Sequence, residues 1–154
     1  MKKILIAIDY HPTAQIVAMN GHTIAKAFGA NVALLHVLAE ATFYSPSIYD
    51  PIMGFSGYAD FSMTSMTIAE NLEHSSYLYL NKIKTFLADD EIKNYVRNGN
   101  CADVIVEAAI ELKAEMIVMG SHSQKWLEHL IIGSVTQKVL HQTQIPMYII
   151  PTKK

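Results

Sequence analysis

Short aliphatic runs alternate with longer helical patterns along this chain of 154 residues. The clearest runs are KILIAID at 3–9 and VALLHVL at 32–38. Near-continuous aliphatic runs of this length are typical of parallel strands that are buried on both faces of a sheet. The segment between them, 14–28, has apolar residues at helical spacing and stops at Gly29. The opening of the chain therefore predicts a strand–helix–strand unit with a right-handed crossover.

The remaining chain continues the same alternation. Three further strands are predicted at 92–96, 116–119 and 147–150, and three further helices at 64–88, 102–112 and 134–141. Five strands that alternate with helices predict an α/β fold, in which a single doubly wound domain has a five-stranded, mostly parallel sheet flanked by helices. The length suits one domain, and we assign residues 1–154 to it.

The predicted helices carry their apolar residues at steps of three and four, as amphipathic helices do. In the helix at 14–28, this stripe consists of Ile16, Met19, Thr23, Ala27 and Phe28. In the long helix at 64–88, it consists of Ala69, Leu72, Ser76, Leu80, Ile83 and Leu87. We expect both stripes to face the core.

Residues 39–63 interrupt the alternation, because prolines and glycines are interleaved with aromatic residues there. We predict a long variable loop. Loops of this length in compact domains are commonly lids or binding loops. A lid over a ligand, packing on the surface and contact with a partner all remain open for this segment.

Charge and composition exclude several classes of function. The net charge is −2, and the basic residues form no cluster longer than the pairs Lys2-Lys3 and Lys153-Lys154, which argues against binding of nucleic acid or of an anionic membrane. No stretch has the length and apolarity of a membrane span. Cys101 is the single cysteine, so the chain cannot form an internal disulfide. We expect a cytoplasmic protein.

The strongest candidate site follows the predicted fourth strand. The apolar run there ends in Met119, Gly120, Ser121, His122 and Ser123, and Gly133, Ser134 and Val135 open the next helix. A helix N-terminus offers unpaired N–H groups and a positive dipole end, which together favour an anion such as phosphate.

Asp9 lies at the carboxyl end of the first strand. If the first and fourth strands are neighbours, Asp9 and Gly120 face one crevice where the strand order reverses, which is where such sheets bind ligands. A plain structural role, with the glycines ending a strand and starting a helix, is the competing interpretation.

These residues resemble the universal stress protein family. The family's nucleotide motif is a glycine, two residues, a second glycine, nine residues and Gly-Ser; here it reads Gly120, Ser121-His122, Ser123, nine residues and Gly133-Ser134. The KILIAID opening, the LLHV of the second strand and the ending GSVTQKVLHQTQIPMYIIP are also similar to the family. The resemblance implies an adenine nucleotide alpha hydrolase-like fold. It also implies a stress-response module that binds ATP, ADP or AMP, with Mg²⁺ brought in by the nucleotide, and acts as a regulatory or partner-binding protein.

The resemblance also implies roles for individual residues. Asp9 and the backbone of Val37 would hold the adenosine part, whereas the loop of Met119, Gly120, Ser121, His122 and Ser123 and the turn of Gly133, Ser134 and Val135 would hold ribose and phosphates. A homodimer formed through the last strand, Met147–Ile150, is implied as well, and such pairing would cover an exposed apolar edge.

Two departures from the family pattern leave other functions open. Ser123 replaces the second glycine, and Tyr10-His11 replaces the usual Gly-Ser after the aspartate, which we expect to add bulk beside the pocket. The alternatives are a dimeric interaction protein that does not bind nucleotide and a slow ATPase. We assign no catalytic residue and no metal ligand, because the sequence shows no convincing base beside a nucleophile and the histidines do not form ligand pairs. His11 and His122 are interpreted as surface residues in loops. His36, in the second strand, is expected to be a hydrogen-bonded core residue.

Overall fold

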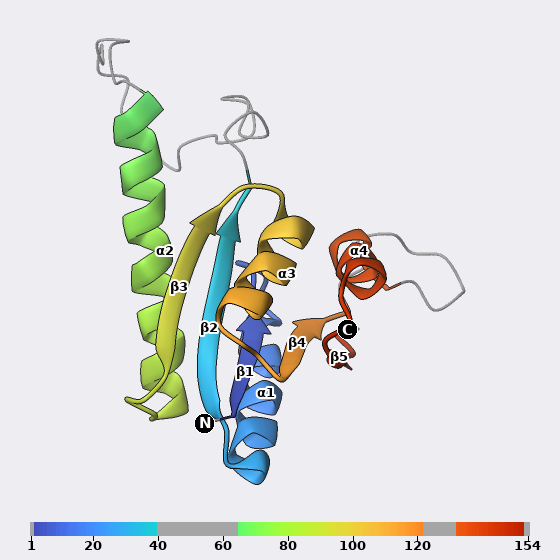
Figure 1. The fold of residues 1–154 in the computed structure, drawn as a ribbon. Helices are drawn as coiled ribbons and strands as arrows, with labels where there is room; N and C mark the ends of the chain where they lie inside the picture. Colours follow the sequence, from blue (N-terminus) through green and yellow to red (C-terminus); the bar gives the residue numbers. More distant parts are fainter. Residues whose placement is uncertain (1, 40–64, 122–131, 153–154) are drawn as a thin grey trace.

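The computed structural model describes residues 2–39, 65–121 and 132–152 of the chain. For residues 65–69 it describes the backbone only. Within this part, five strands form one sheet: β1 Lys3–Ala7, β2 Asn31–Leu38, β3 Lys93–Asn98, β4 Met116–Gly120 and β5 Met147–Ile150. Their order is β3-β2-β1-β4-β5 and every neighbouring pair is parallel (Figure 1). The predicted five-stranded parallel sheet is confirmed.

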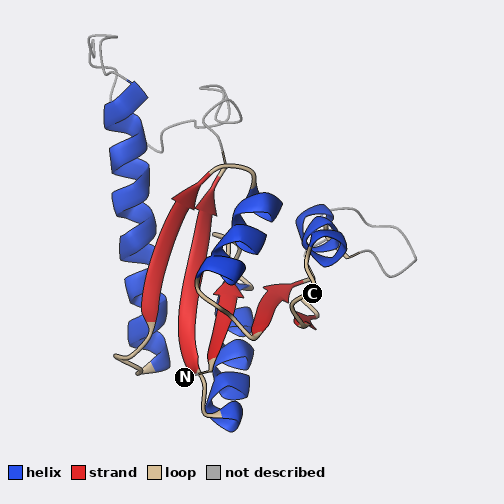
Figure 2. Ribbon diagram, in the orientation of Figure 1, coloured by secondary structure: helices blue, strands red, loops and turns tan. Residues whose placement is uncertain are grey.

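Helices cover both faces of this sheet, as a doubly wound fold requires (Figure 2). On one face, Ile4 and Ile6 of β1 pack with α1 (Ala14–Phe28) and α2 (Ser65–Leu87). On the other face, Leu5 and Ala7 pack with α3 (Cys101–Glu111) and α4 (Ser134–Gln142). Successive side chains of a strand point to opposite faces, so the unbroken aliphatic run of β1 supplies both cores.

The strand order reverses beside β1. This strand pairs with β2 on one side, with Lys3 opposite Asn31, and with β4 on the other, where the ladder ends at Ile6 opposite Val118. The expected adjacency of the first and fourth strands is therefore confirmed. Beyond Ile6 the carboxyl ends of β1 and β4 are no longer paired, which places the switch point of the sheet there.

The predicted apolar face of α1 is wrong. Ile16, Met19 and Phe28 are about half exposed, at 48%, 48% and 56%, whereas the buried residues of α1 are Ala14, Val17, Ala18, Gly21 and Ala25. The physical reason is close approach, because a Cβ on Gly21 would lie 2.7 Å from Cδ1 of Ile6. At Gly21 there is no room for a side chain between this helix and the sheet. In α2 the predicted face is confirmed at Ser76, Leu80 and Ile83, which are buried.

Some predicted boundaries differ from the structure. The first strand is predicted to reach Asp9 but ends at Ala7. The Ile8 N–H still donates to the Leu35 carbonyl, but the Ile8 and Asp9 carbonyls bind side chains, so the ladder goes no further. The third strand extends to Asn98, which pairs with Leu38 of β2. The predicted loop at 39–63 lies, except for residue 39, outside the described residues. None of the helices that the structure describes has the length and apolarity needed to cross a membrane.

Candidate functional site

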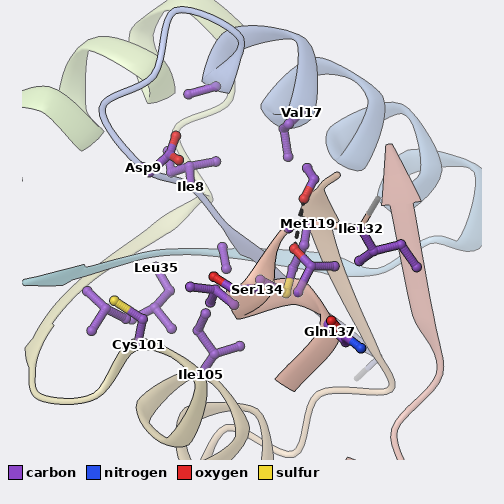
Figure 3. A pocket seen from close by; sticks show the side chains of 17 residues that line it. Ile8, Asp9, Val17, Leu35, Cys101, Ile105, Met119, Ile132, Ser134 and Gln137 are labelled. Atoms are coloured by element: carbon purple, nitrogen blue, oxygen red, sulfur yellow. Dashed lines mark hydrogen bonds between the residues drawn. The ribbon is translucent and has the colours of Figure 1, made fainter. Parts of the chain in front are cut away.

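A cavity of about 680 Å³ opens at the switch point. Most of the described residues that line it are apolar, namely Ala7, Ile8, Ala14, Val17, Leu35, Val37, Ile105, Met119, Ile132 and Val135. Side chains from the start of α1 lie across the cavity from those of α3 (Figure 3). Cavities of a few hundred cubic ångströms with mostly apolar walls and a few polar groups are typical of small-molecule sites.

Most of the described residues that the sequence marked line this one cavity. They are Asp9, Val37, Met119, Gly120, Gly133, Ser134 and Val135. Ser121 does not line it; its Oγ accepts a hydrogen bond from the Thr152 N–H at 3.2 Å and so holds the chain after β5. His122 and Ser123 lie outside the described residues. That any of these residues contacts a nucleotide remains a prediction.

A side-chain hydrogen bond joins the two halves of the glycine motif. The Thr136 hydroxyl, in the first turn of α4, donates to the Gly120 carbonyl at 2.9 Å, so the start of α4 is held against the end of β4. Thr136 is buried. Although ten residues between these segments are not described, the relative position of Gly120 and Gly133 is thus fixed.

The N-termini of α3 and α4 differ in how their N–H groups are satisfied. In α3, Oδ1 of the N-cap Asn100 accepts from the N–H groups of Ala102 and Asp103. In α4 the N-cap is Gly133, which has no side chain to accept a bond, and the first helical bond is donated by Gln137 to the Gly133 carbonyl. The first turn of α4 therefore presents backbone donors beside the cavity, where they can bind an anion.

Asp9 brings a carboxylate to the same cavity. Its Oδ1 accepts from the His11 N–H at 3.0 Å, so the side chain is oriented by the turn that leads into α1. Nδ1 of His11 accepts from the Thr13 N–H at 3.3 Å and lies 2.8 Å from the Thr13 hydroxyl, so this ring is held at the start of α1. His11 is not among the lining residues.

Tyr10 does not crowd the cavity, contrary to the expected bulk beside the pocket. Its ring packs on His36, at 4.4 Å between centroids, and on Tyr79, at 4.9 Å. His36 is buried and its Nδ1 bonds to the Ile8 carbonyl, which confirms the expected core role. Burial lowers the pKa of His36 below its ordinary 6.5, although the Ile8 carbonyl and Asp9 oppose this, so the neutral ring donates through Nδ1–H.

Sequence reasoning missed several residues that line the cavity, and Cys101 is the clearest of them. It is the first residue of α3 and half-buried, and burial raises the pKa of its thiol. The protonated thiol is a weak nucleophile, so it indicates no catalytic role. Cys101 follows the N-cap Asn100 beyond the carboxyl end of β3, and this position is the sequence signal that could have placed it at this edge of the sheet. Among the described residues, no group of three or more His, Cys, Asp or Glu side chains is placed to hold a metal ion.

Comparisons with known proteins agree with this geometry. Residues 1–151 match the model of the universal stress protein family. Universal stress protein MJ0577 of Methanocaldococcus jannaschii is 26% identical over 155 residues, which cover 99% of this chain and 96% of that protein. The solved structure of MJ0577 superposes with a TM-score of 0.72 and covers 99% of this chain and 97% of that one.

Two further solved structures share the fold at lower identity. A universal stress protein in complex with cAMP has a TM-score of 0.63 at 17% identity and covers 99% of this chain and 98% of that one. The Archaeoglobus fulgidus universal stress protein in complex with dAMP also has a TM-score of 0.63, at 19% identity, and covers 97% and 98%. Since the family model spans residues 1–151, which is nearly the whole chain, this chain belongs to the universal stress protein family.

Proposed function

We propose that this protein is a stress-response module that binds an adenine nucleotide (ATP, ADP or AMP) in the switch-point cavity. The observation that carries the proposal is the Thr136–Gly120 hydrogen bond, which sets the N-terminus of α4 on the cavity that Asp9 also lines. Within the described residues, the N-cap Gly133 gives this helix no side-chain cap. Phosphates would bind the N–H groups of Ser134 and Val135, where the helix dipole favours negative charge.

The rest of the cavity suits the nucleoside. Leu35, Ile105 and Met119 supply apolar surface for a flat base. The backbone of Val37 can pair with the adenine edge, and the Asp9 carboxylate can accept hydrogen bonds from sugar hydroxyls. Mg²⁺ bound to the phosphates needs few protein ligands, and the Ser134 hydroxyl is the nearest candidate on the first turn of α4. Relatives in complex with cAMP and with dAMP support an adenine nucleotide as the ligand.

Calorimetry with ATP, ADP and AMP, and mass spectrometry of the denatured protein, test this proposal. We expect saturable binding of at least one of them, and absence of binding at millimolar nucleotide would refute the proposal.

Cys101 gives a second, independent measurement, because it is the single cysteine of the chain and lines the cavity. Bound nucleotide should slow its alkylation, whereas a nucleotide that leaves the rate unchanged is not in this cavity. Since burial raises the pKa of the Cys101 thiol, the rates should be compared at alkaline pH.

The proposal also includes regulation by the bound nucleotide, acting through a partner or through the oligomer. We propose that nucleotide occupancy changes the segments around the cavity and thereby the association of the protein, which forms a homodimer through β5. A protein of the same fold without nucleotide binding is the alternative, favoured by Ser123 in place of the motif's second glycine. Thermal unfolding separates the two, because a melting temperature that rises with ATP counts against the alternative.

A further inference from the structure

An aromatic cluster lies directly behind Asp9, on the face of the sheet that α1 and α2 cover. It consists of Tyr10, His36 of β2 and Tyr79 of α2, and the centroids of His36 and Tyr79 are 6.3 Å apart. The Tyr10 hydroxyl lies 2.7 Å from the Ser76 hydroxyl of α2, which is fully buried. The residue next to Asp9 in the chain is thus fixed by α2 and β2.

Two members of the cluster also bind the backbone that carries Asp9. Nδ1 of His36 bonds to the Ile8 carbonyl at 2.9 Å, and the Tyr79 hydroxyl donates to the Asp9 carbonyl at 2.8 Å. The ladder between β1 and β4 has already ended at Ile6, so β4 does not hold these two peptides. The Ile8 N–H donates to the Leu35 carbonyl of β2 at 3.0 Å, and side chains from β2 and α2 bind the two carbonyls.

We propose that Tyr79 and His36 are positioning residues for Asp9, so that α2 sets the place of the carboxylate in the nucleotide cavity. This inference rests on the proposed function only in assigning the ligand that Asp9 meets. Asp9 faces the cavity while its carbonyl is bound to Tyr79 behind it, so a shift of α2 moves the carboxylate relative to the wall of the cavity. By linkage, a nucleotide bound at Asp9 stabilises the position of α2 to the same extent.

The Tyr79 hydroxyl remains able to donate its hydrogen bond to the Asp9 carbonyl at any pH near neutrality. Burial, and after it the charge of Asp9 and interaction with Tyr10, raise the pKa of Tyr79 to about 12, so this hydroxyl stays a donor throughout the physiological range. The contact between α2 and Asp9 therefore does not depend on pH near neutrality, and it is lost when the single oxygen is removed.

Tyr79→Phe is the decisive variant, because it removes that oxygen and keeps the ring that packs on Tyr10. Tyr77→Phe, on the same helix with a ring that is 37% exposed, is the matched control. We expect Tyr79→Phe to weaken ATP binding about fivefold, as loss of one hydrogen bond to the positioned segment would, and Tyr77→Phe to leave it unchanged. His36→Asn, which keeps an N–H donor near the Nδ1 position, should bind ATP better than His36→Ala.

A double-mutant cycle with Asp9→Ala distinguishes positioning from general loosening of the fold. If Tyr79 acts through Asp9, Tyr79→Phe costs nothing further once the carboxylate is gone. An equal loss in both backgrounds, or no loss in either, overturns the inference. Weak binding by Asp9→Ala together with no effect of Tyr79→Phe leaves the proposed function standing and removes only the inference.

A measurement without nucleotide keeps the inference testable if ATP does not bind at all. The His11 N–H donates to the Asp9 carboxylate, so its ¹H–¹⁵N resonance reports the position of that side chain. Tyr79→Phe should shift this resonance and Tyr77→Phe should not. An unchanged His11 resonance in Tyr79→Phe contradicts the positioning role, whatever the nucleotide result.

Discussion

Asp89 ties the turn after α2 to α1. Its Oδ2 lies 2.8 Å from Nε2 of His22 and 3.2 Å from Nζ of Lys26, and its Oδ1 accepts from the Glu91 N–H. These bonds, with that to His22 the largest contribution, lower the pKa of Asp89 to about 2. As the pH is lowered, the unfolded chain therefore takes up a proton on this carboxyl before the folded protein does. The stability of the folded protein decreases as the pH decreases.

From this we predict an acid-sensitive contribution to stability. It is fully present above about pH 4 and is lost between about pH 4 and pH 2, and after discounting for solvent screening it amounts to about 1 kcal/mol. Urea unfolding across this range should show a smaller loss of stability in Asp89→Asn than in the wild type. Asp90→Asn, at the exposed neighbouring carboxyl, should follow the wild type. A wild-type pH profile in Asp89→Asn would contradict the assignment.

Ser123 is the residue at which the family's nucleotide motif departs in this chain, and it lies outside the described residues. If the position needs a positive φ or close approach of a phosphate, glycine meets that need better than serine. We therefore predict that Ser123→Gly tightens ATP binding several-fold in calorimetry. Ser123→Ala, which removes only the hydroxyl, is the control. Unaltered affinity in Ser123→Gly would show that the missing glycine does not limit binding.

At the scale of the elements, Gly21 sets how closely α1 approaches the sheet. A Cβ at this position would lie 2.7 Å from Cδ1 of Ile6 and 3.1 Å from Cγ1 of Val118, and both side chains are fully buried. Gly21→Ala gains about 1 kcal/mol of helix propensity but overpacks the core at a cost of about 1–3 kcal/mol. We predict a net loss of about 1 kcal/mol in the free energy of unfolding.

The cause of that loss can be tested directly. Ile6→Val removes Cδ1, which is the atom nearest the added methyl group. Alone, Ile6→Val should destabilise the protein by about 1 kcal/mol, as such truncations do. Combined with Gly21→Ala, it should cost less than the sum of the two single changes, measured by chemical unfolding. Simple additivity would mean that the clash is not the cause.

The same glycine explains why the sequence predicted the elements better than their faces. Strand runs and helix spacing located all nine elements of the described part, because those patterns are local. The buried face of α1 was misjudged, since hydrophobicity alone favoured Ile16 and Met19 over Ala18 and Gly21. The choice depends on the distance between helix and sheet, which only the folded packing determines.

At the scale of the whole molecule, the site was predictable where it depends on topology. Asp9 and Gly120 were expected in one crevice because the carboxyl ends of parallel strands meet at the same edge of the sheet. Cys101 and Gln137 were missed, because their approach to the cavity depends on how α3 and α4 rotate against the sheet. The role of Tyr79 was equally hidden, since its partner lies seventy residues away in the chain.

The two edges of the sheet differ in a way that favours association through one of them. Edge strand β3 carries Lys93 and Arg97, and charges of this kind hinder pairing with another chain. Edge strand β5, Met147–Ile150, has only apolar and aromatic residues, and Tyr148 is 45% exposed. We therefore predict an isologous dimer in which β5 pairs with β5 of a second copy.

Main-chain geometry supplies a selective test of this dimer. The Pro146 and Ile150 carbonyls face β4, where they accept from the Ile117 and Ser121 N–H groups. In a parallel pair the odd-numbered residues between them, Met147 and Ile149, direct their N–H groups to the open edge. Ile149→Pro removes one of these two donors without breaking the ladder to β4, as edge strands tolerate. We expect it to be monomeric in sedimentation analysis and to remain folded by circular dichroism, whereas Ile149→Val, which keeps the N–H, should stay dimeric. A dimer that survives Ile149→Pro must use another surface.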